Sequence, residues 1–265
     1  MYQQHFGLSN LPLGKDSQAL WEHASLRDFR TQFLTLLQSP GIGVLTGEPG
    51  VGKTAAIRHI VQTLNPHQYQ VFYLSETHFT SFDIYRQMAI TLGLAPAHRC
   101  AQLWRDIKNF IQDSVDHKRR QPIFIIDEAQ HLPKDFLRDF PSFLNFDFDA
   151  RDMLTVWFVG HPGLANTINR NAYAALSSRI RVRCTFEPII EREAFSKLIE
   201  HAFKTAGCQA KLISESGIEI LRIASQGRPR HVHLILITSM QIAAQRNLNH
   251  LPDDVLQDAI TQLKG

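Results

Sequence analysis

The chain has 265 residues, of which 44% are hydrophobic, and this is enough apolar material for one large domain and a smaller one, each with its own core. The formal net charge is only +3, so the average charge predicts no nucleic-acid surface, and any such surface has to come from local clusters of basic residues. Three widely separated cysteines without a C-x-x-C pair exclude a disulfide framework and fit reduced thiols.

The sequence carries no visible targeting or membrane segment. The first ten residues, MYQQHFGLSN, lack a basic stretch followed by an apolar core, and no apolar run approaches the length that crosses a bilayer. We therefore expect a cytoplasmic protein with no membrane span.

Apolar, β-branched runs alternate with amphipathic stretches through most of the chain. The runs have the character of buried parallel strands, and the stretches between them repeat apolar residues at helical spacing. This alternation predicts an α/β fold with a mostly parallel five-stranded sheet flanked by helices. The expected strands are residues 41–47, 69–75, 122–126, 153–160 and 180–186, and the expected helices are residues 55–64, 82–94, 101–120 and 134–146.

The strand pattern stops near Glu191. Amphipathic stretches follow, and they predict a small C-terminal helical bundle over residues 192–207, 214–227, 228–247 and 252–265. We expect three parts, which are an N-terminal segment packing on the core (1–40), an α/β nucleotide-binding core (41–190) and a helical lid (191–265).

The stretch GEPGVGKT, from Gly47 to Thr54, matches the phosphate-loop pattern G-x-x-x-x-G-K-[ST] between an expected strand and an expected helix. Its glycines allow backbone N–H groups to turn toward phosphate oxygens, and the helix adds the positive end of its dipole. Lys53 is predicted to reach the β- and γ-phosphates of ATP, and Thr54 to hold Mg²⁺. The predicted nucleotide contacts are Gly47, Glu48, Pro49, Gly50, Val51, Gly52, Lys53, Thr54 and Ala55.

A second motif, IFIIDEAQHL, places two acidic residues directly after the third expected strand. Ligands of open parallel sheets bind outside the carboxyl ends of the strands, so Asp127 and Glu128 are well placed for a nucleotide site. Asp127 is predicted to support Mg²⁺ together with Thr54, and Glu128 to orient and polarise the attacking water. The letters DEAQH also resemble helicase boxes, but helicases need two nucleotide-fold domains and this chain has length for one.

Together with these motifs, the C-terminal bundle resembles the lid of the AAA+ ATPases. Within it, GRPRH resembles the second sensor motif, which implies that Arg230 touches the γ-phosphate; the alternative is an exposed arginine near a helix start. LSSRIRV resembles the segment that supplies an arginine finger to the neighbouring subunit, with Arg179 as first choice and Arg181 as second. Outward-facing charges on an edge strand are the alternative there.

The first sensor of AAA+ proteins is a polar residue just past the fourth strand. In FVGHPGL this place falls to His161. Relatives more often carry glutamine, threonine or asparagine, so a histidine departs from the family pattern.

A narrower resemblance spans nearly the whole chain. It is carried by YQQHFGLSNLPLGKD, GIGVLTGEPGVGKT, IIDEAQHL, VGHPGL and GRPRH, which resemble the branch containing the ExeA/GspA secretion ATPases and the transposition regulators of the TnsC, TniB and MuB kind. The branch implies that the N-terminal segment packs near the adenine, with Phe6, Leu11 and Pro12 in the base pocket. An apolar arm that covers the core is the alternative.

The secretion members of this branch continue into a membrane span, whereas this chain stops at Gly265. The resemblance therefore leads us to expect a transposition regulator that forms a homo-oligomer, a ring or a helical filament, on duplex DNA with ATP. Such a regulator selects a target site and stimulates a transposase. The alternative is the ATPase of an ExeA/GspA-type secretion system.

Candidate DNA contacts fall into two groups. Thr77, His78 and Thr80 follow the second expected strand, where related regulators touch the DNA backbone, but the same residues are suited to capping the next helix. The basic candidates are Arg105, Lys108, Lys118, Arg119 and Arg120. Cations at the end of a helix are also expected from the helix dipole alone.

Two other classes of protein share the phosphate loop. A small-molecule kinase needs an acceptor pocket and has little use for an arginine finger or a separate helical bundle. A scaffold that binds nucleotide without hydrolysing it has no need of Glu128. Arg179 and Glu128 therefore favour a switch in which ATP joins subunits and hydrolysis loosens them.

Overall fold

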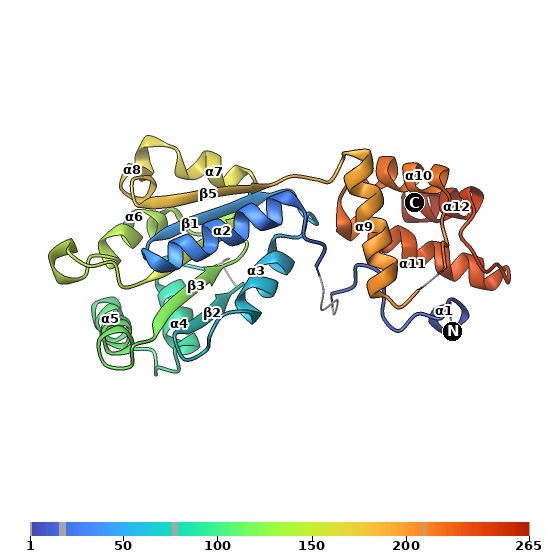
Figure 1. The fold of residues 1–265 in the computed structure, drawn as a ribbon. Helices are drawn as coiled ribbons and strands as arrows, with labels where there is room; N and C mark the ends of the chain where they lie inside the picture. The colour runs from blue at the N-terminus through green and yellow to red at the C-terminus, as the bar shows by residue number, and fades with distance from the viewer. Residues whose placement is uncertain (1, 16–19, 76–78, 209, 265) are drawn as a thin grey trace. The chain divides into compact units, whose positions relative to one another are not determined.

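A computed structural model describes residues 2–15, 20–75, 79–208 and 210–264 of the chain. The chain divides into two compact units (Figure 1). The sheet unit consists of Ser25–Gly47 and Ile60–Phe186, and the helical unit consists of Met1–Ala24, Glu48–His59 and Glu187–Gly265.

Five parallel strands form the sheet, in the order β2-β3-β4-β1-β5. They are β1 (Ile42–Gly47), β2 (Tyr69–Leu74), β3 (Gln121–Ile126), β4 (Thr155–Gly160) and β5 (Ile180–Phe186). Every residue of β1 and β4 is buried, as central parallel strands require, whereas β5 is an edge strand in which exposed residues alternate with more buried ones. The predicted α/β fold with a parallel five-stranded sheet is confirmed.

The helix α2 (Ala24–Gln38) covers one face of this sheet. The ring of Phe33 stacks on the ring of Trp157 in β4, with the ring centres 5.2 Å apart. Phe29 meets the same indole edge-on, also with 5.2 Å between the ring centres. The helix α2 is not among the elements expected from the sequence, although its apolar residues repeat at helical spacing.

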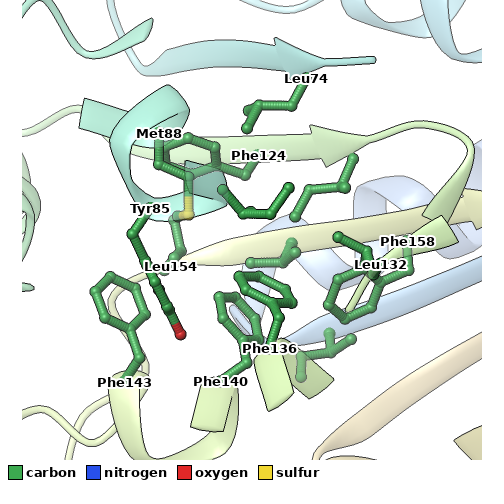
Figure 2. Packing of buried hydrophobic residues seen from close by; sticks show 14 of the residues in the cluster. Leu74, Tyr85, Met88, Phe124, Leu132, Phe136, Phe140, Phe143, Leu154 and Phe158 are labelled. Carbon is green, nitrogen blue, oxygen red and sulfur yellow. The ribbon is translucent and has the colours of Figure 1, made fainter. Parts of the chain in front are cut away.

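Aromatic residues pack the opposite face of the sheet. The helices there are α4 (Ser81–Thr91), α5 (Cys100–Asp116) and α6 (Lys134–Phe143). Figure 2 shows Tyr85 of α4 beside Phe136, Phe140 and Phe143 of α6. The centre of the Tyr85 ring lies 5.2 Å from the ring centres of Phe136 and Phe143. The expected helix over residues 134–146 therefore forms despite Pro141, which is itself buried.

Short helices connect the longer elements of the sheet unit. They are η1 (Ala129–His131), η2 (Asp147–Asp149), α7 (Gly163–Ile168), η3 (Asn171–Tyr173) and α8 (Ala174–Ser177). Since η1 follows β3 and α7 follows β4, both lie at the carboxyl edge of the sheet, where the predicted acidic motif also begins.

The helical unit is built around an apolar core that includes Phe195, Leu236 and Leu256. Its helices are α1 (Tyr2–His5), α9 (Arg192–Thr205), α10 (Glu215–Ser225), α11 (Pro229–Gln245) and α12 (Asp253–Lys264). Side-chain caps fix two of the helix starts, because Glu191 accepts backbone N–H groups of α9 and Ser214 accepts one of α10. Across the described ranges, no helix combines the length and the apolar character that a membrane crossing needs.

Candidate nucleotide site

The loop after β1 is shaped by glycines in conformations that other residues rarely adopt. Gly50 has a φ of +86° and Gly52 a φ of +103°, where a Cβ atom brings steric cost. Among the described residues, no atom lies within 4 Å of a Cβ built on Gly52, so this position needs backbone freedom rather than room. A glycine-shaped turn of this kind is what a phosphate cradle requires.

The helix α3 (Lys53–Gln62) begins directly after the loop, so its first backbone N–H groups and the positive end of its dipole lie at the cradle. The Lys53 ammonium donates to the Glu48 carbonyl oxygen at 3.1 Å and so bends back over the loop. Thr54 follows in the first turn and carries a hydroxyl oxygen, a ligand type that Mg²⁺ accepts. These residues fit the phosphates of ATP and its metal ion.

Arg230 lies beside the same loop, within the helical unit. Its backbone N–H donates to the Gly50 carbonyl at 3.2 Å, and a Cβ atom on Gly50 would come 3.0 Å from the Cβ of Arg230. Pro229 occupies the first position of α11, where its missing N–H costs nothing and its fixed φ favours the helix. The second-sensor candidate is thus held next to the cradle, while its contact with a γ-phosphate stays a prediction.

Asp127 is 5% exposed, and its carboxylate accepts hydrogen bonds from Glu128 and Tyr73. The Glu128 N–H donates to Oδ1 at 2.9 Å, and the hydroxyl of Tyr73 in β2 donates to Oδ2 at 2.8 Å. A buried carboxylate needs such partners. The sequence alone does not single out Tyr73, because its place in YQVFYLS indicates only a strand residue.

Glu128 has a left-handed backbone, with φ 51° and ψ 35°, and its side chain is exposed. Its Oε2 accepts a hydrogen bond from Gln130 Nε2 at 2.6 Å. Gln130 Oε1 in turn accepts the backbone N–H of His161, the first residue after β4, at 3.0 Å. The structure therefore links Glu128 to His161 through Gln130, which is not among the residues predicted from the sequence.

The two arginine-finger candidates lie at the opposite edge of the sheet from the acidic motif. Arg179 directly precedes β5 and Arg181 is the second residue of that strand, so both are at the amino ends of the parallel strands. Their guanidinium groups pair with Asp149 and Asp152, and all four residues line a cavity of about 240 Å³. Strands of this length span about 20 Å, so neither arginine reaches the acidic motif of its own chain.

The candidates for an adenine pocket belong to the helical unit. Phe6 is 7% exposed and forms part of the core between the C-terminal helices. The ring Nδ1 of His233 donates to the carbonyl oxygen of the buried Pro12 at 2.7 Å, and Leu11 is half-buried. The structure packs this segment against the C-terminal helices, and its contact with the base stays a prediction.

Thr80 is the described member of the first group of DNA candidates, since Thr77 and His78 lie outside the described residues. Its hydroxyl accepts the N–H of Asp83 at 3.3 Å and donates to Oδ2 of Asp83 at 2.6 Å. Thr80 therefore caps α4, which is the alternative that the sequence left open.

Lys108 holds α5 against the turn that follows α6. Its ammonium donates to the Asn145 carbonyl at 2.7 Å and lies 5.0 Å from the centre of the Phe146 ring. Partial burial of the Lys108 ammonium lowers its pKa below the ordinary value of a lysine. The contacts give Lys108 a structural role, and contact with DNA stays a prediction.

The other basic candidates lie on α5 or in the segment after it. Lys118 pairs with Asp113 at 2.6 Å, and the Arg120 guanidinium donates twice to the Pro66 carbonyl, at 3.2 and 2.6 Å. Arg119 lines a separate cavity of about 360 Å³, and Arg105 is exposed on α5. DNA contact stays a prediction for all four.

The sequence of this chain is similar to a known protein family and to a known secretion protein. Residues 24–168 match the family model described as AAA domain. The whole chain is 24% identical to general secretion pathway protein A of Aeromonas hydrophila and spans 49% of that relative, so the likeness concerns about half of the relative's length.

Solved structures share the arrangement of helices and strands. Cdc6p from Pyrobaculum aerophilum superposes with a TM-score of 0.70 at 17% identity, over 97% of this chain and 70% of that one. Drosophila ORC bound to DNA gives a TM-score of 0.72 at 16% identity, over 100% of this chain and 65% of that one. Likeness at these identities concerns the fold.

Proposed function

Because this chain belongs to the AAA domain family and is an ATPase, we propose that ATP controls its assembly on duplex DNA, where it selects a target site and stimulates a transposase. The predicted AAA+ fold and ATPase activity agree with the family match and with the solved structures that share the fold. The DNA-directed, transposition-regulating role is the part that we propose.

The position of Arg179 carries this proposal. Within the sheet unit it lies at the amino edge of the strands, whereas Asp127 and Glu128 follow the carboxyl end of β3. An arginine that does not reach the acidic motif of its own chain suits a nucleotide held by a neighbouring subunit. Its planar fork of donors matches the spread charge of a phosphoryl transition state.

The other residues take the following roles. Lys53 binds the β- and γ-phosphates, and Thr54 and Asp127 are the oxygen ligands on the protein side for Mg²⁺, which neutralises phosphate charge when bound. Glu128 orients the attacking water and accepts its proton. Arg230 and the Arg179 of a neighbouring subunit hold the γ-phosphate, so both lose a partner when it is cleaved, and the interface loosens.

Duplex DNA is the proposed partner because two lines of reasoning agree on it. The branch that the motifs resemble contains transposition regulators, and Drosophila ORC, which shares the fold, was solved bound to DNA. Fold alone does not fix function, so the DNA-directed role has to be measured.

A second candidate is the ATPase of an ExeA/GspA-type secretion system. It is favoured by the 24% identity to general secretion pathway protein A, which extends over the whole of this chain. In that case the partner is another protein of the secretion machinery, and no nucleotide state promotes DNA binding.

Fluorescence anisotropy of a labelled random-sequence duplex tests the choice. The protein is titrated in ATP, in ADP and in a slowly hydrolysed ATP analogue, at low and at physiological salt. We expect cooperative, salt-sensitive binding with ATP or the analogue only. The Lys53→Ala variant, which loses the phosphate ligand, is the control that should bind no better with ATP than with ADP. Absence of binding in every state would favour the secretion candidate.

Glu128→Gln tests the switch itself. Without a general base the variant should bind ATP, hydrolyse it far more slowly and accumulate as an ATP-bound oligomer. Light scattering after size-exclusion chromatography measures the assembly. A variant that stays monomeric with ATP at high protein concentration would contradict the switch.

A further inference from the structure

We infer that Gln130 is a positioning residue, which aims the carboxylate of Glu128 and couples it to the end of β4. The inference rests on the proposed role of Glu128 as the residue that activates water. It concerns three residues of the sheet unit, Glu128, Gln130 and His161, which two hydrogen bonds join in a row.

The chemistry of the two neighbours fixes the orientation of the Gln130 amide. The backbone N–H of His161 only donates, so the oxygen of the amide has to face it, at 3.0 Å. The NH₂ group then faces Oε2 of Glu128, at 2.6 Å, and a carboxylate is an acceptor. Only one of the two amide orientations satisfies both neighbours.

Gly160 provides the space in which the amide lies. A Cβ atom on this last residue of β4 would come 2.4 Å from the Gln130 oxygen and 3.4 Å from the Gln130 backbone nitrogen. No real side chain tolerates the shorter distance. The glycine at this position therefore allows the close approach of the glutamine to the strand end.

The backbone on the other side of the contact is also fixed. Glu128 has a left-handed conformation, and the N–H of His131 donates to its carbonyl at 3.0 Å, closing the turn η1. Such a conformation is costly for a residue other than glycine and persists where its surroundings hold it. Gln130 is half-buried in this turn and ties the Glu128 side chain to a neighbouring strand, so any shift at the end of β4 is passed to the carboxylate.

The test separates the two hydrogen bonds by substitution. Gln130→Glu keeps an acceptor for the His161 N–H but replaces the donor to Glu128 by a second carboxylate. Gln130→Met removes both bonds and keeps the length of the side chain. We expect both variants to lower kcat for ATP hydrolysis by about tenfold or more, a part of what a placed general base contributes, with little change in KM.

The pH profile of kcat distinguishes positioning from a merely structural role. In Gln130→Glu a like charge lies next to Glu128 and disfavours its ionised form, so the acid limb of the profile should move to higher pH. In Gln130→Met the repulsion is missing and the shift should be smaller. A structural defect alone would lower the amount of active protein without moving the limb.

Gly160→Ala provides a second, independent approach, because its Cβ displaces the amide without changing Gln130. It should lower kcat in the wild-type background and add nothing in a Gln130→Ala background. Additive losses would overturn the inference, and so would wild-type kcat and pH profiles in both Gln130 variants.

Glu128→Gln, measured in parallel, distinguishes failure of this inference from failure of the proposed function. Wild-type hydrolysis in Glu128→Gln would remove the proposed role of Glu128 and with it the inference. Loss of hydrolysis in Glu128→Gln, with unaltered Gln130 variants, would overturn the inference about Gln130 alone.

Discussion

Arg179 and Asp149 form a bidentate ion pair, with Nη1 2.9 Å from Oδ1 and Nη2 3.0 Å from Oδ2. Asn145 Oδ1 accepts a further bond from Nη2 at 2.6 Å. Asp149 ends a run of three non-glycine residues with left-handed backbone, in which Asp147, Phe148 and Asp149 have φ values of 47°, 57° and 67°. A run of left-handed residues costs conformational free energy. The bonds from Arg179 to Asp149 and Asn145 help to hold the turn that carries the Asp149 carboxylate.

Asp149→Ala removes the partner that keeps Arg179 within its own chain. The pair is partly exposed, so the loss in free energy of unfolding should stay below about 1 kcal/mol. Assembly with ATP should begin at a lower protein concentration, because no internal pair has to break before Arg179 serves a neighbouring subunit. Light scattering over a concentration series measures this onset.

Asp135→Ala is the matched control for Asp149→Ala. It removes a carboxylate from another surface pair, with Arg138 at 3.6 Å, and should leave assembly unchanged. An unchanged onset in Asp149→Ala as well would mean that the Arg179–Asp149 pair plays no part in assembly.

Gly50→Ala should weaken nucleotide binding beyond its effect on stability. Gly50 and Gly93 have similar backbones, with φ +86° and +80°, so alanine at either position should cost about 1 kcal/mol or somewhat more. At Gly50 the new Cβ also comes 3.0 Å from the Cβ of Arg230, whereas the described residues leave the space around Gly93 open to 4 Å. We expect similar melting temperatures and, for Gly50→Ala alone, about tenfold weaker ATP binding by calorimetry. Equal ATP affinities in the two variants would contradict a coupling between the loop and Arg230.

Gly43→Ala should destabilise the sheet unit strongly. A Cβ at this position would lie 2.6 Å from ring carbons of Trp157, and that ring is held by the stacked ring of Phe33. Overpacking against a fixed ring costs about 1–3 kcal/mol. Gly41→Ala is the control, because its Cβ meets the partly exposed, flexible side chain of Arg181 at 2.8 Å rather than a buried ring. Denaturation midpoints that fall equally in both variants would refute the argument.

Tyr85→Phe should stabilise the protein. The Tyr85 side chain is 1% exposed, and within the described ranges its hydroxyl finds no hydrogen-bond partner among the aromatic rings shown in Figure 2. An unpaired buried hydroxyl is costly, so its removal should raise the free energy of unfolding by about 1 kcal/mol. Burial also raises the pKa of Tyr85 far above its ordinary value, so an alkaline absorbance titration should count one tyrosinate fewer in folded wild type than in unfolded protein. A lower melting temperature for the variant would show that the hydroxyl has a stabilising contact.

The elements that the sequence predicted are those in which burial imposes a pattern on neighbouring residues. The central strands β1 and β4 are buried throughout and appear as unbroken apolar runs, and the helices after Glu191 repeat apolar residues at helical spacing. Within the site, the motif spacing was enough to select Lys53 and Asp127 as candidates.

The residues that the sequence did not reveal depend on which strands are neighbours. Tyr73 meets Asp127 because β2 pairs with β3, and Gln130 meets His161 because β3 also pairs with β4. Strand order is set by packing over the whole sheet, so no local pattern reports it. The glutamine directly after DEA was the available signal, since a polar side chain there has few partners other than the ends of neighbouring strands.

The hydrogen bond between Arg230 and Gly50 makes the phosphate loop depend on the C-terminal helices. The phosphate loop belongs to the same compact unit as α9 to α12, although the strand that leads into it belongs to the other unit. A fragment ending at Phe186 would retain all five strands and the complete GEPGVGKT motif, yet the Gly50 carbonyl would lose the amide that it accepts. Truncation after the last strand would therefore remove part of the support of the phosphate loop. A weak nucleotide affinity measured on such a fragment would reflect the lost contact and not the affinity of the intact protein.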